Sequence, residues 1–278
     1  MGVAVRVYQT SLNAVFDVLL FPFGSGPPVI GLAAVSLGAG VLMVVIFRFA
    51  SNQRGIRAAK EKIKAHLLEI RLFKDDPVLI MRAQKQVFMA SLVYMRYALV
   101  PFAVMVVPLL IFLLQLNLYF GYRPLRPGES AIVAVTVSEQ VPWGDVTVHL
   151  DAPQGMVVET PALRMEEGRE VDWRLKATRE GRFQLTVRLA DREFQKEVRV
   201  GDRLARVTPS RRGGQLLAMG FAQGEPVLPS GAPVEAIEVG YPPRSISMLG
   251  WQAHWFVVFL VLSLVSGYTL SWVFRIEV

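Results

Sequence analysis

The sequence contains no cysteine and only three histidines among its 278 residues. Without cysteine, neither a disulfide framework nor a thiolate metal site can form. The three histidines, His66, His149 and His254, lie far apart, and no histidine–acid cluster has the spacing of metal ligands. We therefore expect neither a metal site nor catalytic residues.

A glycine-rich phosphate loop is also missing. Gly38-Ala39-Gly40 lies inside a long apolar run, where such small residues are typical of helix packing. The sequence thus predicts a protein that is not an enzyme and that binds no cofactor. Charged residues are few, at 19%, whereas hydrophobic residues reach 53% and are concentrated in long runs. This composition argues against a soluble protein.

Three apolar runs are long enough to cross a bilayer, which takes about twenty helical residues. Residues 29–47 carry no charge, and they begin too late, with too little basic sequence before them, for a cleaved signal peptide. Residues 97–118 contain two prolines, which membrane helices tolerate when neighbouring groups satisfy the freed carbonyls. Residues 251–274 have tryptophans at both ends, as interfacial belts do. We expect three transmembrane helices at these positions.

The net charge of +7 is concentrated in one segment. Residues 48–96 hold eleven Lys or Arg and four acidic residues, while residues 119–250 hold seventeen of each sign. A basic chain raises the question of nucleic-acid binding, but a charge excess confined to one loop between spans fits the positive-inside bias better. The pattern predicts a cytoplasmic basic segment, an outside N-terminus, a cytoplasmic tail at 275–278 and no nucleic-acid partner.

Residues 1–28 mix polar and apolar side chains. Leu12, Val15, Phe16 and Leu19 recur at helical spacing, which predicts an outer amphipathic helix at the membrane interface. Proline and glycine then end this helix and turn the chain into the first span.

The basic segment 48–96 has a seven-residue apolar period on both sides of Asp75-Asp76-Pro77. Asp76 suits an N-cap, and proline suits the first helical turn. The pattern predicts an antiparallel helical hairpin with coiled-coil-like packing, and many of its basic residues have a simpler interpretation as solvated faces. The periodic residues are Ile56, Ile63 and Ile70 in the first helix and Met81, Phe88 and Met95 in the second.

Residues 119–200 change character, because several short segments alternate apolar and polar residues between turn signals. This pattern predicts an extracytoplasmic β-sandwich of immunoglobulin-like type, without its disulfide and with Trp173 in the core. Residues 201–250 are rich in Gly, Pro and Arg and are expected to be a linker with one extra strand at 233–241. The alternating segments are 131–137, 146–150, 171–177, 183–189 and 194–200.

Several polar residues near the expected spans are candidates for a substrate groove, because polar side chains in membrane spans usually face a protein or water-filled interior. Two alternatives stay open: the arginines anchor the topology at the interface, and the serines only pack helices. The candidates are Arg48, Asn52, Arg96, Gln115, Asn117, Ser263 and Ser266.

This layout resembles the YidC/Oxa insertase superfamily, most closely its three-span branch, with an inserted extracytoplasmic β-domain. The likeness is carried by residues 52–64, by the second hairpin helix and by the proline-containing span 97–118. It implies a membrane protein insertase or chaperone of a bacterial inner membrane. Such a protein opens a polar groove to the cytoplasm and to lipid, and its mobile hairpin receives nascent membrane proteins.

The alternative is a structural or scaffolding membrane subunit. In that case the β-sandwich binds an extracytoplasmic protein partner, and the hairpin couples it to a cytoplasmic one. Both interpretations share one fold: an α-helical membrane protein with three transmembrane helices and a cytoplasmic hairpin, plus an all-β domain outside the membrane. Its expected partners are the lipid bilayer, together with nascent membrane proteins or another membrane subunit.

Overall fold

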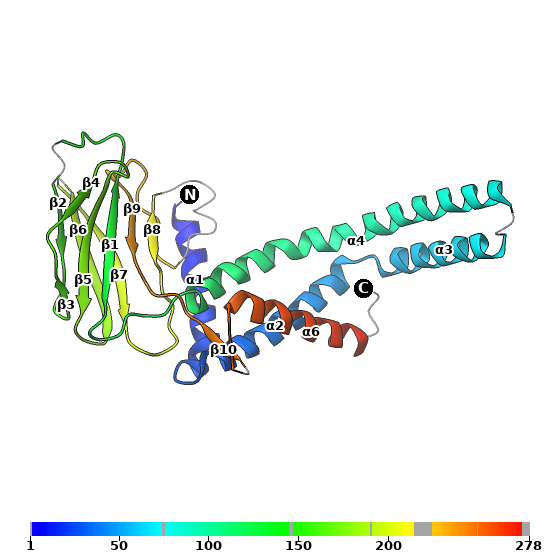
Figure 1. The fold of residues 1–278 in the computed structure, drawn as a ribbon, viewed down its shortest axis with the longest axis horizontal. Helices are drawn as coiled ribbons and strands as arrows, with labels where there is room; N and C mark the ends of the chain where they lie inside the picture. The colour runs from blue at the N-terminus through cyan, green and yellow to red at the C-terminus, as the bar shows by residue number, and fades with distance from the viewer. Residues whose placement is uncertain are drawn as a thin grey trace. The chain divides into compact units, whose positions relative to one another are not determined.

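Three α-helices in the computed structural model are long and apolar enough to cross a bilayer. They are α2, Pro28–Ala50, α4, Pro77–Phe120, and α6, Trp255–Val273 (Figure 1). Their length and composition indicate a membrane protein. The structure describes residues 2–73, 76–144, 147–189, 191–213, 224–248 and 250–273, so the expected tail 275–278 lies outside the described residues.

Contacts divide the chain into two units. The β unit comprises Met1–Leu32 and Phe112–Trp255, and the helical unit comprises Ala33–Ile111 and Phe256–Val278. Among the described residues, the other α-helices are α1, Gly2–Leu20, which continues into the short 3-10 helix η1, Phe21–Phe23, and α3, Gln53–Leu72.

Helix α4 is continuous over 44 residues and passes through Pro101 and Pro108 without a break. The expected second span, 97–118, and the expected second hairpin helix are therefore parts of one helix. Each proline removes one backbone donor, and the helix continues on both sides of it.

Helices α2 and α6 make close contact at small residues within the helical unit. The Ser266 hydroxyl donates a hydrogen bond to the carbonyl oxygen of Leu37, with 3.3 Å between the two oxygens. A Cβ added at Gly40 would collide with Ser266 Oγ and would lie 2.9 Å from the carbonyl oxygen of Ser263. The contact thus depends on the absence of a side chain at Gly40, as in other close packings of membrane helices.

The β unit contains two main antiparallel sheets. The larger sheet has the order β3-β5-β1-β9-β8, with β4 also paired to β5, and the smaller has the order β2-β6-β7. The strands of the larger sheet are β1, Ser130–Val137, β3, Met156–Val158, β4, Leu163–Met165, β5, Glu170–Ala177, β8, Ser210–Arg212, and β9, Val234–Val239. Those of the smaller sheet are β2, Val148–Asp151, β6, Gly181–Leu189, and β7, Arg192–Val200.

One hydrophobic core takes inward side chains from both sheets. Val133 and Val135 of β1 alternate with outward residues, as do Leu185 and Val187 of β6, and all four are fully buried. Trp173 of β5 belongs to this core, which confirms its expected role. The period-2 pattern of the sequence therefore identified the faces correctly.

Segment 201–250 was expected to be a linker with one extra strand at 233–241. That strand is confirmed as β9, which lies inside the larger sheet, between β1 and β8. The described part of the segment is more than a linker, since β8 also pairs with β9 and Val207 is fully buried. Strand β8 was not predicted because it is only three residues long and lies between Pro209 and Gly213.

The expected third span began at Trp251, but helix α6 begins at Trp255. The residues before it, β11, Trp251–Ala253, pair with β10, Ile246–Met248. An 18-residue apolar window still remains within α6.

We predict that Gly40→Val destabilises the protein by about 2 kcal/mol, because the added methyl groups force α2 and α6 apart. The measurement is thermal unfolding of the full chain in detergent, followed by circular dichroism.

Gly38→Val is the matched control, since a Cβ at Gly38 meets nothing within 4 Å. Both variants place the same β-branched residue in the same helix. Equal melting temperatures for the two variants would contradict the packing contact.

Candidate functional site

The basic segment forms a hairpin whose helix starts are fixed by capping side chains. Asn52 Oδ1 accepts a hydrogen bond from the backbone nitrogen of Gly55 at 3.0 Å at the start of α3. Asp76 Oδ1 accepts from the backbone nitrogens of Val78 at 2.9 Å and Leu79 at 3.2 Å at the start of α4. These bonds satisfy amide groups that the first helical turn leaves unpaired.

Helix α3 and the first half of α4 lie side by side and antiparallel (Figure 1). Gly55 faces the ring of Tyr97, since a Cβ there would lie 2.9 Å from the ring. Farther along, Lys60 Nζ lies 5.9 Å from the ring centre of Tyr94. The buried residues at this seam are Ile56, Ala59, Ala83 and Ala90.

The predicted seam of the second hairpin helix is wrong. Met81, Phe88 and Met95 are 72%, 59% and 50% exposed, whereas Ala83 and Ala90 are buried. The buried residues do recur every seven positions, as predicted. They are the alanines, and not the methionines and Phe88. Small side chains allow the two helices to approach closely, and the larger apolar residues are left outside.

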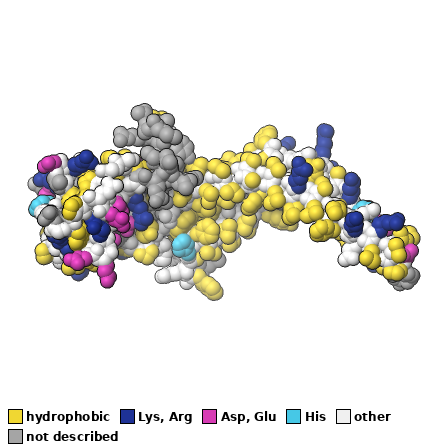
Figure 2. Space-filling model, turned by 90° about the horizontal axis from the view of Figure 1, so that it is seen from above, with side chains coloured by type: hydrophobic (Ala, Val, Ile, Leu, Met, Phe, Trp, Pro, Cys, Tyr) yellow, Lys and Arg dark blue, Asp and Glu magenta, His cyan; other side chains and the backbone are white. Residues whose placement is uncertain are grey.

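The hairpin therefore carries an exposed apolar surface, called here the apolar hairpin face. Its residues follow helical spacing along α4, on the side opposite the buried alanines, and Arg82 and Lys85 are exposed beside them. Figure 2 shows Lys and Arg side chains among hydrophobic ones on this segment. The face comprises Val78, Met81, Phe88, Leu92 and Met95.

Five of the seven predicted groove residues lie in the helical unit. Arg48 and Arg96 are exposed, and Asn52 is the cap of α3. The hydroxyl of Ser263 donates to the carbonyl oxygen of Leu260 at 3.1 Å, within its own helix, and Ser266 joins α6 to α2. Both serines thus bond to helix backbone, as expected for the helix-packing alternative.

The other two predicted residues, Gln115 and Asn117, lie in the β unit. Gln115 is buried, and its Nε2 donates to Oδ1 of Asn13 in α1 at 3.3 Å. Asn13 Nδ2 in turn donates to the carbonyl oxygen of Gly224 at 3.3 Å. These contacts tie α1 to the end of α4 and to the segment before β9.

A second polar contact repeats this connection. Tyr119 Oη donates to Asp17 Oδ1 at 2.5 Å, and Arg206 Nη1 lies 3.3 Å from Asp17 Oδ2. Sequence reasoning missed both contacts because the partners are 102 or more residues apart. The available signal was the spacing of Asn13 and Asp17, four residues apart, which places both on one side of a helix.

A buried ion pair fixes the same segment to β7. Lys196 is fully buried, and its Nζ donates to the carbonyl oxygen of Thr208 at 2.6 Å and to Glu225 Oε2 at 2.7 Å. Burial lowers the pKa of Lys196, and the carboxylate of Glu225 partly offsets this effect. The sequence signal was a lysine at an inward position of the alternating strand, between Phe194 and Val198.

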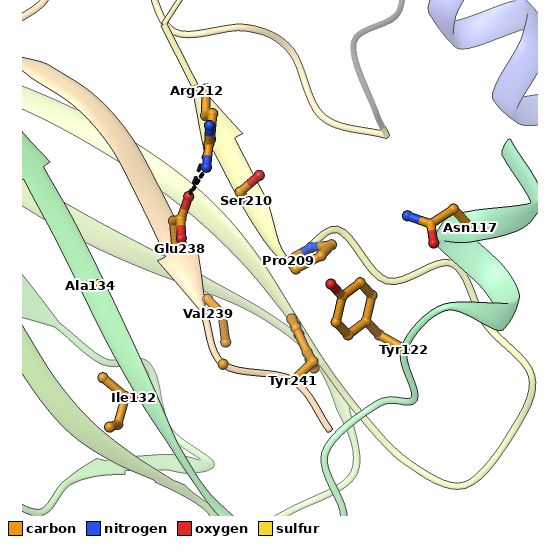
Figure 3. Close-up of a pocket in the computed structure, with 11 residues that line it drawn as sticks. Asn117, Tyr122, Ile132, Ala134, Pro209, Ser210, Arg212, Glu238, Val239 and Tyr241 are labelled. Carbon is orange, nitrogen blue, oxygen red and sulfur yellow. Dashed lines mark hydrogen bonds and ion pairs between the residues drawn. The ribbon is translucent and has the colours of Figure 1, made fainter. Parts of the chain in front are cut away.

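A cavity of about 420 Å³ lies on the face of the larger sheet that points away from the core (Figure 3). Its lining combines aromatic and apolar side chains with polar ones, among which Arg212 and Glu238 form an ion pair of 2.8 Å. Asn117, a predicted groove residue, is part of this lining. Other residues at the cavity are Tyr122, Ile132, Ala134, Ser210 and Tyr241.

No protein-family model, curated protein or solved structure matches this chain. Within the described ranges, no three His, Cys, Asp or Glu side chains are grouped so that they could hold a metal ion.

We predict that Glu225→Gln lowers the free energy of unfolding by about 3 kcal/mol, because it leaves the buried charge of Lys196 without its counter-ion. The measurement is urea unfolding of the full chain in detergent, followed by tryptophan fluorescence.

The double variant Lys196→Met/Glu225→Gln is the control, since it removes both charges. It should recover at least half of the loss. A double variant less stable than Glu225→Gln would contradict the ion pair as the origin of the effect.

Proposed function

We propose that this protein is a membrane protein insertase or chaperone, similar to the three-span branch of the YidC/Oxa superfamily. The observation that supports the proposal is the apolar hairpin face. The hairpin that carries it connects two candidate membrane spans. In the proposed topology the N-terminus lies outside a bacterial inner membrane and the C-terminus lies in the cytoplasm. The hairpin then meets nascent membrane proteins on the side where they are made.

An exposed apolar surface of this kind favours the binding of an apolar segment. Each Å² of apolar surface removed from water contributes about 25 cal/mol. Methionine is unbranched and adapts to partners of different shape, which suits a surface that receives many clients. Arg82 and Lys85, exposed beside the face, would attract the acidic flanks of such a client.

The continuity of α4 supports a path from this face to the bilayer. Beyond Met95 the same helix continues with the exposed apolar residues Leu99 and Phe102. A client bound along the hairpin would therefore move toward lipid without leaving the helix. Arg48 and Arg96, both exposed, are the proposed positive charges at the groove entrance.

In this proposal the two sheets of the β unit lie outside the membrane. Two antiparallel sheets with one shared core fit an immunoglobulin-like sandwich, which would form the extracytoplasmic domain. No cofactor or covalent intermediate takes part, because transfer of an apolar segment into lipid is favourable by itself.

The variant Met81→Ser/Phe88→Ser/Met95→Ser tests the proposal. We expect it to lose most of the insertion activity of the full chain in liposomes, measured by protease protection of a small membrane protein with a short translocated tail. The physical reason is the loss of apolar area on an exposed face.

Gln84→Ser/Gln86→Ser is the matched control, because both glutamines are exposed on the same helix and are polar. This variant should insert the client normally, and circular dichroism should show equal helix content for both proteins. Full insertion by the triple variant, or no insertion by the unaltered chain, would refute the proposal.

A scaffolding subunit is the second candidate function, and the cavity beside Tyr122 and Tyr241 supports it. Its mixed aromatic and polar lining suits a protruding side chain of an extracytoplasmic protein partner. The hairpin would then couple this partner to a cytoplasmic one.

We predict that Ala134→Trp, which fills the cavity, abolishes co-purification of a cross-linked partner from native membranes while insertion is unchanged. Arg174→Trp, on the same sheet face but outside the lining, is the control and should retain the partner. Loss of the partner in both variants would count against the cavity as its site.

A further inference from the structure

Helix α1 turns its polar side toward the protein. Asn13 bonds to Gln115 and Gly224, and Asp17 bonds to Tyr119 and Arg206. Phe16 and Leu20, on the same side of the helix, are buried. The polar and buried residues of α1 therefore share one face, which packs on the rest of the β unit.

The opposite face of α1 is exposed and apolar. Val18 is 74% exposed, and Phe21, which follows the helix in η1, is 83% exposed. Val7, Val15 and Leu19 complete this face, and the residues between them, such as Ser11 and Ala14, are small and uncharged. A helix at a water-exposed surface has the reverse arrangement, with its charged residues outward.

The neighbours of α1 place it at membrane level. The rings of Phe16 and Phe112 lie 5.0 Å apart, and the bonds to Gln115 and Tyr119 fall on the next two turns of α4. These turns belong to a helix that is long and apolar enough to span a bilayer. In addition, only seven residues separate Leu20 from Pro28, where the next candidate span begins.

We infer that α1 is embedded in the bilayer beside the end of α4, with the face from Val7 to Phe21 in contact with lipid acyl chains. An apolar face gains free energy there, and the protein supplies polar partners to Asn13 and Asp17 on the other side of the helix. The sequence predicted an interfacial helix, and the structure assigns which face meets lipid. This inference does not depend on the proposed insertase function.

The same contacts would fasten the β unit to the membrane. Gly224, which accepts the hydrogen bond from Asn13, precedes Glu225, the partner of the buried Lys196. A helix held in lipid is thereby linked to strand β7 through two consecutive residues. A surface of the β unit is in this way kept close to the bilayer.

The absence of cysteine allows a direct test with single-cysteine variants of the full chain. Val15→Cys and Val18→Cys are spin-labelled, and the chain is reconstituted into vesicles of phosphatidylethanolamine and phosphatidylglycerol. Collision with oxygen, which concentrates in lipid, is compared with collision with a water-soluble nickel chelate. Leu264→Cys in α6 is the lipid-facing control, and Val157→Cys in β3 is the water-facing control; both native residues are exposed.

At positions 15 and 18 we expect oxygen collision to exceed nickel collision several-fold, as at position 264, with the reverse at position 157. Nickel collision that predominates at 15 and 18 would place this face in water and overturn the inference. Low collision with both reagents, together with dipolar broadening between labels on two chains, would show that a second copy covers the face, which would also overturn it.

Discussion

Buried polar groups need partners, and this requirement determines how the β unit is held together. An unpaired buried donor or acceptor costs about 1–3 kcal/mol, and an unpaired buried charge costs more. Lys196 can occupy the core of the β unit only because Thr208 and Glu225 satisfy its ammonium group. In the same way, the hydrogen bond from Gln115 to Asn13 gives each of these buried side chains one polar partner. The same rule applies in the helical unit, where Ser266 bonds to a carbonyl oxygen of the neighbouring helix.

This requirement also explains why α1 and the segment before β9 belong to one structure. Arg206, Thr208, Gly224 and Glu225 come from a stretch that has the composition of a linker. Arg206 forms an ion pair with Asp17 of α1, and the other three accept hydrogen bonds from α1 or β7. These four residues are therefore held by polar groups of α1 and β7, since none of them lies in a strand. The orientation of α1 follows as well, because a helix whose polar face is held by protein must direct its apolar face outward.

The sequence predicted those features that depend on local patterns. The three apolar runs, the helix start at Asp76-Pro77 and the alternating strands all follow from interactions between near neighbours, and the structure places helices and strands there. The contact between Asn13 and Gln115 could not be predicted, because nothing local specifies a partner 102 residues away. The candidate groove residues show the same limit: Asn52 and Ser266 were noticed as polar residues near the membrane, but their actual partners depend on how the helices pack.

The error in the hairpin seam has a physical meaning of its own. Coiled-coil reasoning places the largest apolar residues inside, because their burial contributes most to stability. In this hairpin the buried positions of α4 are alanines, while Met81, Phe88 and Met95 are exposed. A seam of alanines buries little apolar area. The hairpin is therefore less stable than it would be if α4 were rotated so that its methionines and Phe88 faced α3. Stability of the isolated chain alone therefore does not account for this arrangement. An exposed apolar face of this kind favours contact with another apolar surface, and the proposed function would use it to hold a client segment.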